Sequence, residues 1–181
     1  SLFKAVLVIS ERIMELRGNY NQSITVTKKI NSSKKELWSH ISSPSHLNLS
    51  HPFCKENEVI SWEDNNRSDI LIYLNGLVYI RNFTNWKENK GYTLFIGEKN
   101  KSKSKVIWKI SNKNKETLLS ITVFPYFMRK YPKIISHIPY LVYIKPKLKN
   151  YLESVLKGID WYLKKKKSVP RNKFGKHSWF S

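Results

Sequence analysis

Short apolar segments separated by polar turns fill the middle of the chain, and this pattern constrains the fold more than any other feature. Six strands are predicted, over residues 59–62, 69–74, 77–86, 92–97, 105–110 and 117–125. The breaks between them are too short for a crossover helix, so consecutive strands should pair antiparallel. Asn75-Gly76 is the strongest hairpin signal, because both residues tolerate positive φ. The pattern disfavours a doubly wound parallel sheet, and no glycine-rich phosphate loop is present.

The segment before these strands supplies one more strand and two short helices. Residues 24–30 alternate like a strand, and Ser33 and Glu36 have the spacing of a capping box at a helix start. Ser43-Pro44 then restarts helical geometry, which predicts a second short helix over residues 44–49.

A long helix is predicted after the strands. Apolar residues between Leu141 and Leu163 recur at the period of one helical face over more than six turns. Pro146 lies inside this pattern, and proline is tolerated in a first helical turn. The helix should therefore begin near Lys145, the alternative being a kink at Pro146.

In this order of elements the chain resembles the START-like superfamily, also called SRPBCC, which includes polyketide cyclase or dehydrase-type domains and plant pollen-allergen proteins. The residues that carry the resemblance are strand 24–30, segment 35–44 (KELWSHISSP), Leu47, and His51-Pro52-Phe53. The resemblance implies an α+β helix-grip fold. In that fold a curved antiparallel seven-stranded sheet wraps around a long C-terminal helix, with two short helices after the first strand.

The resemblance covers residues 22–167, which we expect to form a single helix-grip domain. Residues 1–21 are interpreted as an N-terminal extension. Their apolar residues at helical spacing predict an amphipathic helix: Leu2, Val6, Ile9, Ile13 and Leu16. Residues 168–181 are interpreted as a basic, polar C-terminal tail.

The superfamily also implies an elongated apolar cavity between sheet and helix, where its members bind lipids, sterols, polyketides or other hydrophobic molecules. We therefore expect this chain to bind a hydrophobic small molecule or lipid. A cyclase or dehydrase-like enzyme using the same cavity is the alternative, with Arg81, Tyr73 or Tyr79 orienting a polar substrate. The candidate lining residues, which could instead be ordinary packed core, are Tyr73, Tyr79, Arg81, Phe83, Phe95, Trp108, Phe124, Tyr151 and Val155.

Arg81 is the most informative of these candidates. Alternation along residues 77–86 puts Leu77, Tyr79, Arg81 and Phe83 on one face, and Val78, Ile80, Asn82 and Trp86 on the other. If Tyr79 faces inward, so does Arg81. A buried guanidinium needs a partner, which an acidic group of the ligand could supply. The alternative places Arg81 on the exposed outer face.

The charge of the chain permits a third class of function. Lysine and arginine number 33 against 13 acidic residues, which gives a net charge of +20. Basic residues accumulate from Lys145 to Lys176, so this Lys-rich C-terminal region could contact an anionic membrane, nucleic acid or an acidic protein. The excess is lysine rather than arginine, however. Since lysine, asparagine and isoleucine are all abundant, a solvated surface produced by compositional drift explains the charge equally well.

Few residues suggest a metal, a cofactor or a membrane span. The lone cysteine, Cys54, excludes an intramolecular disulfide and favours the cytoplasm. His46, His51 and Cys54 match no standard zinc spacing, so neither a metal nor a cofactor is expected. Every apolar stretch is shorter than the roughly 18 to 20 residues that a transmembrane helix requires, so no such segment is expected.

Overall fold

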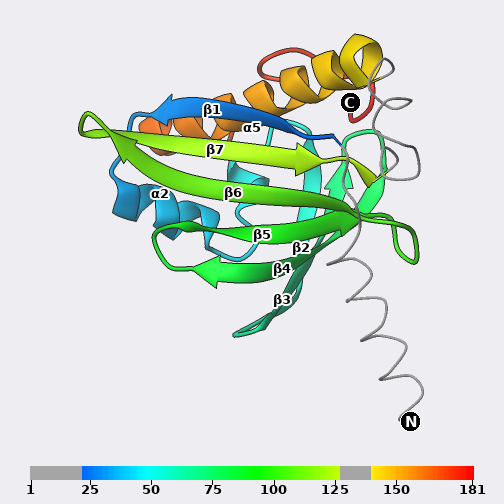
Figure 1. Ribbon diagram of the computed structural model, residues 1–181, viewed down its shortest axis with the longest axis horizontal. Helices are drawn as coiled ribbons and strands as arrows, with labels where there is room; N and C mark the ends of the chain where they lie inside the picture. The colour runs from blue at the N-terminus through cyan, green and yellow to red at the C-terminus, as the bar shows by residue number, and fades with distance from the viewer. Residues whose placement is uncertain (1–21, 127–139) are drawn as a thin grey trace.

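One antiparallel sheet and one long helix make up most of the structure, a computed structural model that describes residues 22–126 and 140–181. The sheet has seven strands in the order β1-β7-β6-β5-β4-β3-β2. Figure 1 shows the sheet curving past the long helix α5, with the short helix α2 near one end. This arrangement confirms the expected α+β helix-grip fold. The amphipathic helix predicted for residues 1–21 lies outside the described residues.

The strands follow one another as hairpins, as the short polar breaks predict. Their bounds are β1 Ile24–Ile30, β2 Cys54–Glu63, β3 Asn66–Tyr73, β4 Val78–Lys87, β5 Gly91–Gly97, β6 Ser104–Lys113 and β7 Glu116–Phe124. Asparagines with positive φ stand in several of the turns, among them Asn65, Asn89, Asn100 and Asn114. Asparagine adopts this left-handed conformation more readily than most residues, which fits it to tight turns.

The first strand pairs with the last one. β1 runs antiparallel to β7, with Ile24 opposite Val123 and Ile30 opposite Thr117. This pairing brings residues more than 85 positions apart side by side and completes the sheet on the side where α5 packs.

α2 and α5 begin where the sequence indicates, whereas α3 begins at Leu47 instead of residue 44. α2 spans Lys34–Ile41, and the Ser33 hydroxyl accepts a hydrogen bond from the Glu36 amide, as in a capping box. α3 spans Leu47–Ser50 and is shorter than expected. α5 spans Lys145–Lys165 with Pro146 in its first turn, and a π-helical turn, η2 Tyr140–Ile144, precedes it.

A bulge in β4 alters the faces that simple alternation assigns. The pairing with β5 shifts register between Thr84 and Lys87, and Asn85 has a φ of 47°. The extra residue reverses the alternation, so Trp86 packs against Phe83 and stacks on Tyr92 at 4.9 Å. The assignment of Trp86 to the face opposite Phe83 was therefore wrong.

Residues 168–181 pack against the domain instead of extending from it. The Val169 amide donates a hydrogen bond to the Leu49 carbonyl, and the Asn172 amide donates one to the Pro52 carbonyl, both at 2.9 Å. Phe180 is 7% exposed within a second, smaller core cluster that also contains Leu47, Phe53, Leu71 and Tyr73. The composition is basic and polar, as expected, but a few apolar side chains anchor the segment.

Candidate functional site

A cavity of about 150 Å³ lies between the sheet and α5. This size is comparable to that of cavities that hold one aromatic ring. The lining is mainly apolar and comes from five strands, α3, α5 and the C-terminal segment. Residues that line it include Leu47, Leu71, Leu94, Ile96, Val106, Ile121, Val123, Leu148, Leu152, Val155, Trp108, Trp179 and Phe180.

Three polar side chains of the lining form a hydrogen-bonded chain. The Nε2 atom of His51 lies 2.9 Å from the Tyr151 hydroxyl, which lies 2.9 Å from the Tyr73 hydroxyl. All three residues line the cavity. They come from the end of α3, the second turn of α5 and the end of β3, so the chain connects three separate elements.

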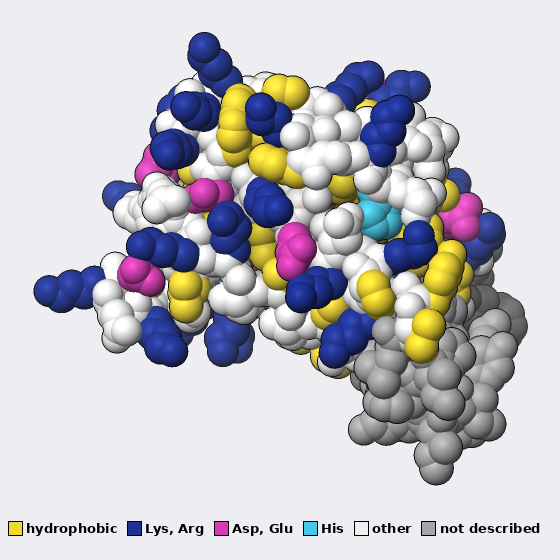
Figure 2. Space-filling model, turned by 90° about the horizontal axis from the view of Figure 1, so that it is seen from above, with side chains coloured by type: hydrophobic (Ala, Val, Ile, Leu, Met, Phe, Trp, Pro, Cys, Tyr) yellow, Lys and Arg dark blue, Asp and Glu magenta, His cyan; other side chains and the backbone are white. Residues whose placement is uncertain are grey.

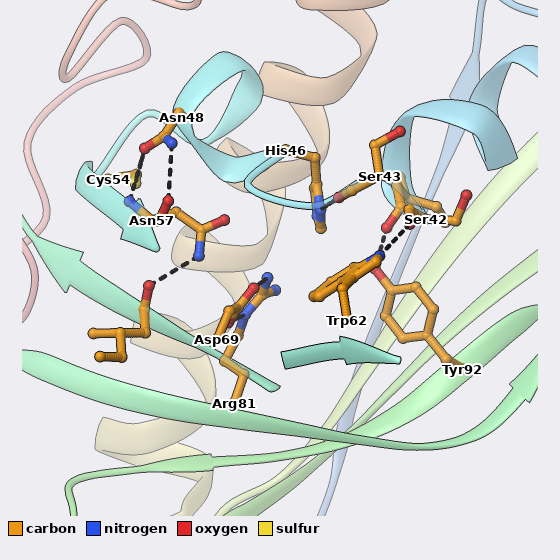
Figure 3. A network of polar contacts seen from close by, with 12 residues as sticks. Ser42, Ser43, His46, Asn48, Cys54, Asn57, Trp62, Asp69, Arg81 and Tyr92 are labelled. Carbon is orange, nitrogen blue, oxygen red and sulfur yellow. Dashed lines mark hydrogen bonds and ion pairs between the residues drawn. The ribbon is translucent and has the colours of Figure 1, made fainter. Parts of the chain in front are cut away.

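Local structure fixes the position of His51. The residue ends α3, where its amide donates to the Leu47 carbonyl at 3.0 Å, and Pro52 follows it. Asn48 joins α3 to β2, because its side-chain oxygen accepts from the Asn57 amide at 2.7 Å and its nitrogen donates to the Asn57 carbonyl at 3.0 Å (Figure 3). The imidazole therefore projects from an anchored helix end.

The protonation state of His51 follows from its contacts. Its Nδ1 atom accepts a hydrogen bond from the Phe53 amide at 3.2 Å, so the ring hydrogen of the neutral form is on Nε2. Burial, together with the positive charge of Arg81, lowers the pKa of His51 to about 3. At neutral pH the ring is therefore uncharged and donates to Tyr151.

Three charged side chains line the cavity, and all are paired within the protein: Lys101 pairs with Glu98, and Arg81 pairs with Asp69. Arg81 is 2% exposed and Asp69 is fully buried, and the two stand directly opposite each other on β4 and β3. Nε and one terminal nitrogen of Arg81 donate to the two carboxylate oxygens of Asp69, at 2.7 and 2.5 Å (Figure 3). Burial alone would lower the pKa of Arg81, but Asp69 outweighs this effect and raises it. Of the two alternatives for Arg81, the inward one holds, and Asp69 rather than an acidic ligand group compensates its charge.

Six of the nine residues predicted from the sequence surround the cavity. They are Tyr73, Tyr79, Arg81, Trp108, Tyr151 and Val155. They come from β3, β4, β6 and α5, which the fold brings together around one space.

Phe83, Phe95 and Phe124 are not part of the lining. Phe83 is on the same face of β4 as Arg81 but packs among Trp62, Trp86 and Tyr92, further along the strand. Phe95 alternates with Leu94 and Ile96, and Phe124 alternates with Val123 and Pro125, which do line the cavity. The neighbouring residues therefore take the positions predicted for these two phenylalanines.

Among the lining residues outside the predicted set, three polar or aromatic ones contribute most to the site: His51, Trp179 and Phe180. His51 was interpreted only as a landmark that closes the second short helix, and Trp179 and Phe180 were included in the polar tail. Phe180 stacks on Tyr73 at 4.3 Å and contacts the Tyr151 ring at 4.6 Å. The signal that could have identified Trp179 and Phe180 as lining residues is that they form an adjacent aromatic pair in an otherwise polar segment.

Basic side chains cover much of the surface. Figure 2 shows Lys and Arg distributed over the face seen from above, with acidic and apolar side chains between them. Within the Lys-rich C-terminal region, Lys166 pairs with Glu36 and Lys149 with Glu153, while Lys147 donates to the Ser178 hydroxyl.

Neither a metal site nor a membrane span is found in the described part of the chain. Within residues 22–126 and 140–181, no group of three or more His, Cys, Asp or Glu side chains is placed to hold a metal ion. Cys54 is buried, which raises the pKa of its thiol to about 12, and its sulfur donates to Asn48. In the same residues, no helix has the length and hydropathy required to cross a bilayer.

Solved structures of other proteins have a similar fold. No protein-family model and no curated protein sequence matches the chain. TTHA0849 from Thermus thermophilus superposes with a TM-score of 0.62 at 12% identity, covering 81% of this chain and 100% of that one. DynU16, encoded in the dynemicin biosynthetic locus, gives 0.61 at 12% identity, covering 81% and 48%. StfQ, a di-domain ARO/CYC of the steffimycin biosynthetic pathway, gives 0.60 at 9% identity, covering 80% and 51%.

These neighbours and the strand order decide the fold. The chain has the START-like helix-grip fold. It spans about half the length of DynU16 and of StfQ, and all of TTHA0849. At these identities the likeness concerns the START-like fold, which agrees with the resemblance found in the sequence.

Proposed function

We propose that this START-like domain binds a hydrophobic small molecule in the cavity between the sheet and α5. The observation that carries the proposal is the composition of the cavity wall. Aliphatic and aromatic side chains dominate, and the buried polar groups, Arg81 and the three residues of the hydrogen-bonded chain, are held in place by other protein groups. Cavities of this composition are typical small-molecule sites, because apolar burial supplies affinity and a few fixed polar groups supply orientation.

The protonation states in the cavity favour binding over acid-base catalysis. The pKa of His51 is lowered to about 3, chiefly by burial. Burial also raises the pKa of Tyr73 and of Tyr151. An efficient general acid or base needs a pKa near the working pH, and these three groups are far from neutrality. StfQ is described as an ARO/CYC, so a cyclase-like reaction in the same cavity is the alternative to be tested.

Native mass spectrometry of gently purified protein, followed by denaturing extraction, tests the proposal. The expected result is a stoichiometric adduct of a small apolar molecule that is released on denaturation. If the protein is recovered without an adduct, titration with neutral aromatic probes follows. Failure to bind any such probe would contradict the proposal.

A cavity-filling substitution makes this test specific to the site. Val155→Phe enlarges a buried residue of α5 that lines the cavity, whereas Val78→Phe makes the same change at an exposed position of β4. We expect Val155→Phe to weaken probe binding by at least about tenfold, because close-packed interiors leave no room for both groups. Val78→Phe should bind like the original protein.

Salt dependence separates cavity binding from surface binding. An apolar ligand in the cavity should bind almost equally at low and high salt, because burial of apolar surface depends little on ionic screening. Binding of an anionic membrane or of nucleic acid through the Lys-rich C-terminal region should weaken steeply as salt rises. A steep decrease for the molecule that copurifies would assign it to the surface.

A further inference from the structure

The hydrogen-bonded chain in the cavity contains one more hydrogen than it can use. His51 carries a hydrogen on Nε2, because Nδ1 already accepts from the Phe53 amide. Tyr151 and Tyr73 carry one hydroxyl hydrogen each. Three hydrogens are thus available for two contacts, one from His51 to Tyr151 and one between the tyrosines.

The remaining hydrogen belongs to one of the two tyrosines in either arrangement. If Tyr151 donates to Tyr73, the Tyr73 hydrogen is left over. If Tyr73 donates instead, Tyr151 accepts twice and keeps its own hydrogen. Both tyrosines line the cavity, and a buried hydroxyl hydrogen without an acceptor is unfavourable. An acceptor oxygen inside the cavity would remove this cost.

The charge of the cavity indicates which acceptor fits. The guanidinium of Arg81 is already compensated by both carboxylate oxygens of Asp69. At the Tyr73 and Tyr151 end, an entering carboxylate would lose its hydration and gain only the hydroxyl hydrogen left over from the chain, while Asp69 already compensates Arg81, which is unfavourable. A ketone, ester or ether oxygen loses far less hydration and needs only one donor.

We infer that the ligand of this cavity is a neutral hydrophobic molecule that carries an acceptor oxygen, such as a ring ketone, bound by the hydroxyl left over from the Tyr73–Tyr151–His51 chain. This inference rests on the proposed function and adds the chemical class of the ligand to it. The orientation follows as well, because the oxygen must face the Tyr73 and Tyr151 end of the cavity.

Three bicyclic probes built on the tetralin ring system test the inference by calorimetric titration. They are 1-tetralone, tetralin, and the carboxylate 1,2,3,4-tetrahydro-1-naphthoate. We expect tetralone to bind about two- to tenfold more tightly than tetralin, the usual net value of one hydrogen bond. The carboxylate should bind most weakly. The infrared carbonyl stretch of bound tetralone should lie at lower frequency than in hexane, which reports the hydrogen bond directly.

Variants test the count of hydrogens. Tyr73→Phe still leaves one phenolic hydrogen, on Tyr151, and should retain the preference for tetralone. Tyr73→Phe/Tyr151→Phe removes both phenolic hydrogens and should lose most of the preference and of the frequency shift. The donor that remains is His51 Nε2, which lies 2.9 Å from the position of the Tyr151 oxygen that this variant lacks. Tyr162→Phe is the control, because it removes a tyrosine hydroxyl of α5 that does not line the cavity.

Each outcome has a distinct meaning. Equal binding of tetralone and tetralin, with an unshifted carbonyl stretch, would overturn the inference and leave the proposed function intact. Tightest binding of the carboxylate would also overturn it and would indicate that the charge of Arg81 governs recognition. If none of the three probes binds and no apolar molecule copurifies, the proposed function itself fails.

Discussion

Asp69 and Arg81 face each other across β3 and β4 and share two hydrogen bonds in a site closed to solvent. Direct cross-strand opposition gives this pair its bidentate geometry. The charges of the two side chains are compensated inside the protein, so the wall of the cavity next to Arg81 is electrically neutral overall.

The free energy of unfolding should show this coupling. Asp69→Leu or Arg81→Leu leaves one buried charge without its partner, and each is expected to destabilise the protein by about 3–5 kcal/mol. The double variant Asp69→Leu/Arg81→Leu should recover most of this loss, because it leaves no buried charge. Urea denaturation of the four proteins measures the cycle. Additive losses in the double variant would contradict the pairing.

Stability should decrease as pH falls below 6.5. Burial lowers the pKa of His40 to about 4 and of His51 to about 3, from a usual value of 6.5. Between pH 6.5 and these lowered pKa values, the unfolded chain binds protons that the folded protein does not. The free energy of unfolding therefore keeps its full value above pH 6.5 and decreases as the pH falls towards 4 and 3. Each histidine contributes a slope of up to about 1.4 kcal/mol per pH unit.

Glutamine replacements separate the two histidines in this prediction. Unfolding free energies measured from pH 7.5 to 4.5 should show a smaller slope in His40→Gln and in His51→Gln than in the original protein. If the slopes are unchanged, these side chains are not the groups responsible.

The contact between α5 and the end of α3 should make Gly158 irreplaceable. A Cβ atom at this position would stand 2.1 Å from the Ser50 carbonyl oxygen, so the two elements would have to separate. Gly158→Ala is expected to destabilise by about 1–3 kcal/mol, although alanine favours a helix over glycine by nearly 1 kcal/mol. Thermal unfolding measures the effect. Lys157→Ala, at the exposed neighbouring position, is the control and should have little effect, and a stabilised Gly158→Ala variant would refute the contact.

The C-terminal segment should contribute to stability through Phe180. Its ring stacks on Tyr73 at 4.3 Å and is buried in the smaller core cluster. Phe180→Ala should cost about 3–5 kcal/mol if its site cannot collapse, and less if the segment relaxes. Ser178→Ala, which removes an exposed contact with Lys147, serves as the comparison. Equal stability of the two variants in urea would show that the segment is not anchored through Phe180.

Local signals in the sequence predicted the elements, because they act between neighbouring residues. The Ser33 and Glu36 capping box, the Asn75-Gly76 turn and Pro146 all mark element boundaries that the structure has within a few residues. Alternation also placed Tyr79 and Arg81 on one face. These signals involve contacts over a few residues, so no knowledge of the tertiary structure is needed to interpret them.

The parts of the site that depend on register were not predictable in this way. Identifying Asp69 as the partner of Arg81 requires the pairing of β3 with β4, and the position of Trp86 depends on the bulge at Asn85. Phe180 reaches Tyr73 across 107 positions of the chain, and no local pattern encodes such a contact. Resemblance to a family supplied the general position of the cavity but not the three residues His51, Trp179 and Phe180.

The Phe180 side of the cavity wall has a consequence for biosynthesis. All seven strands and α5 precede residue 166, so the ribosome completes the sheet and its helix before it adds Trp179 and Phe180. The wall of the cavity is therefore complete only once residues 179 and 180 have been added, which happens after the residues of the sheet and of α5 have been synthesised.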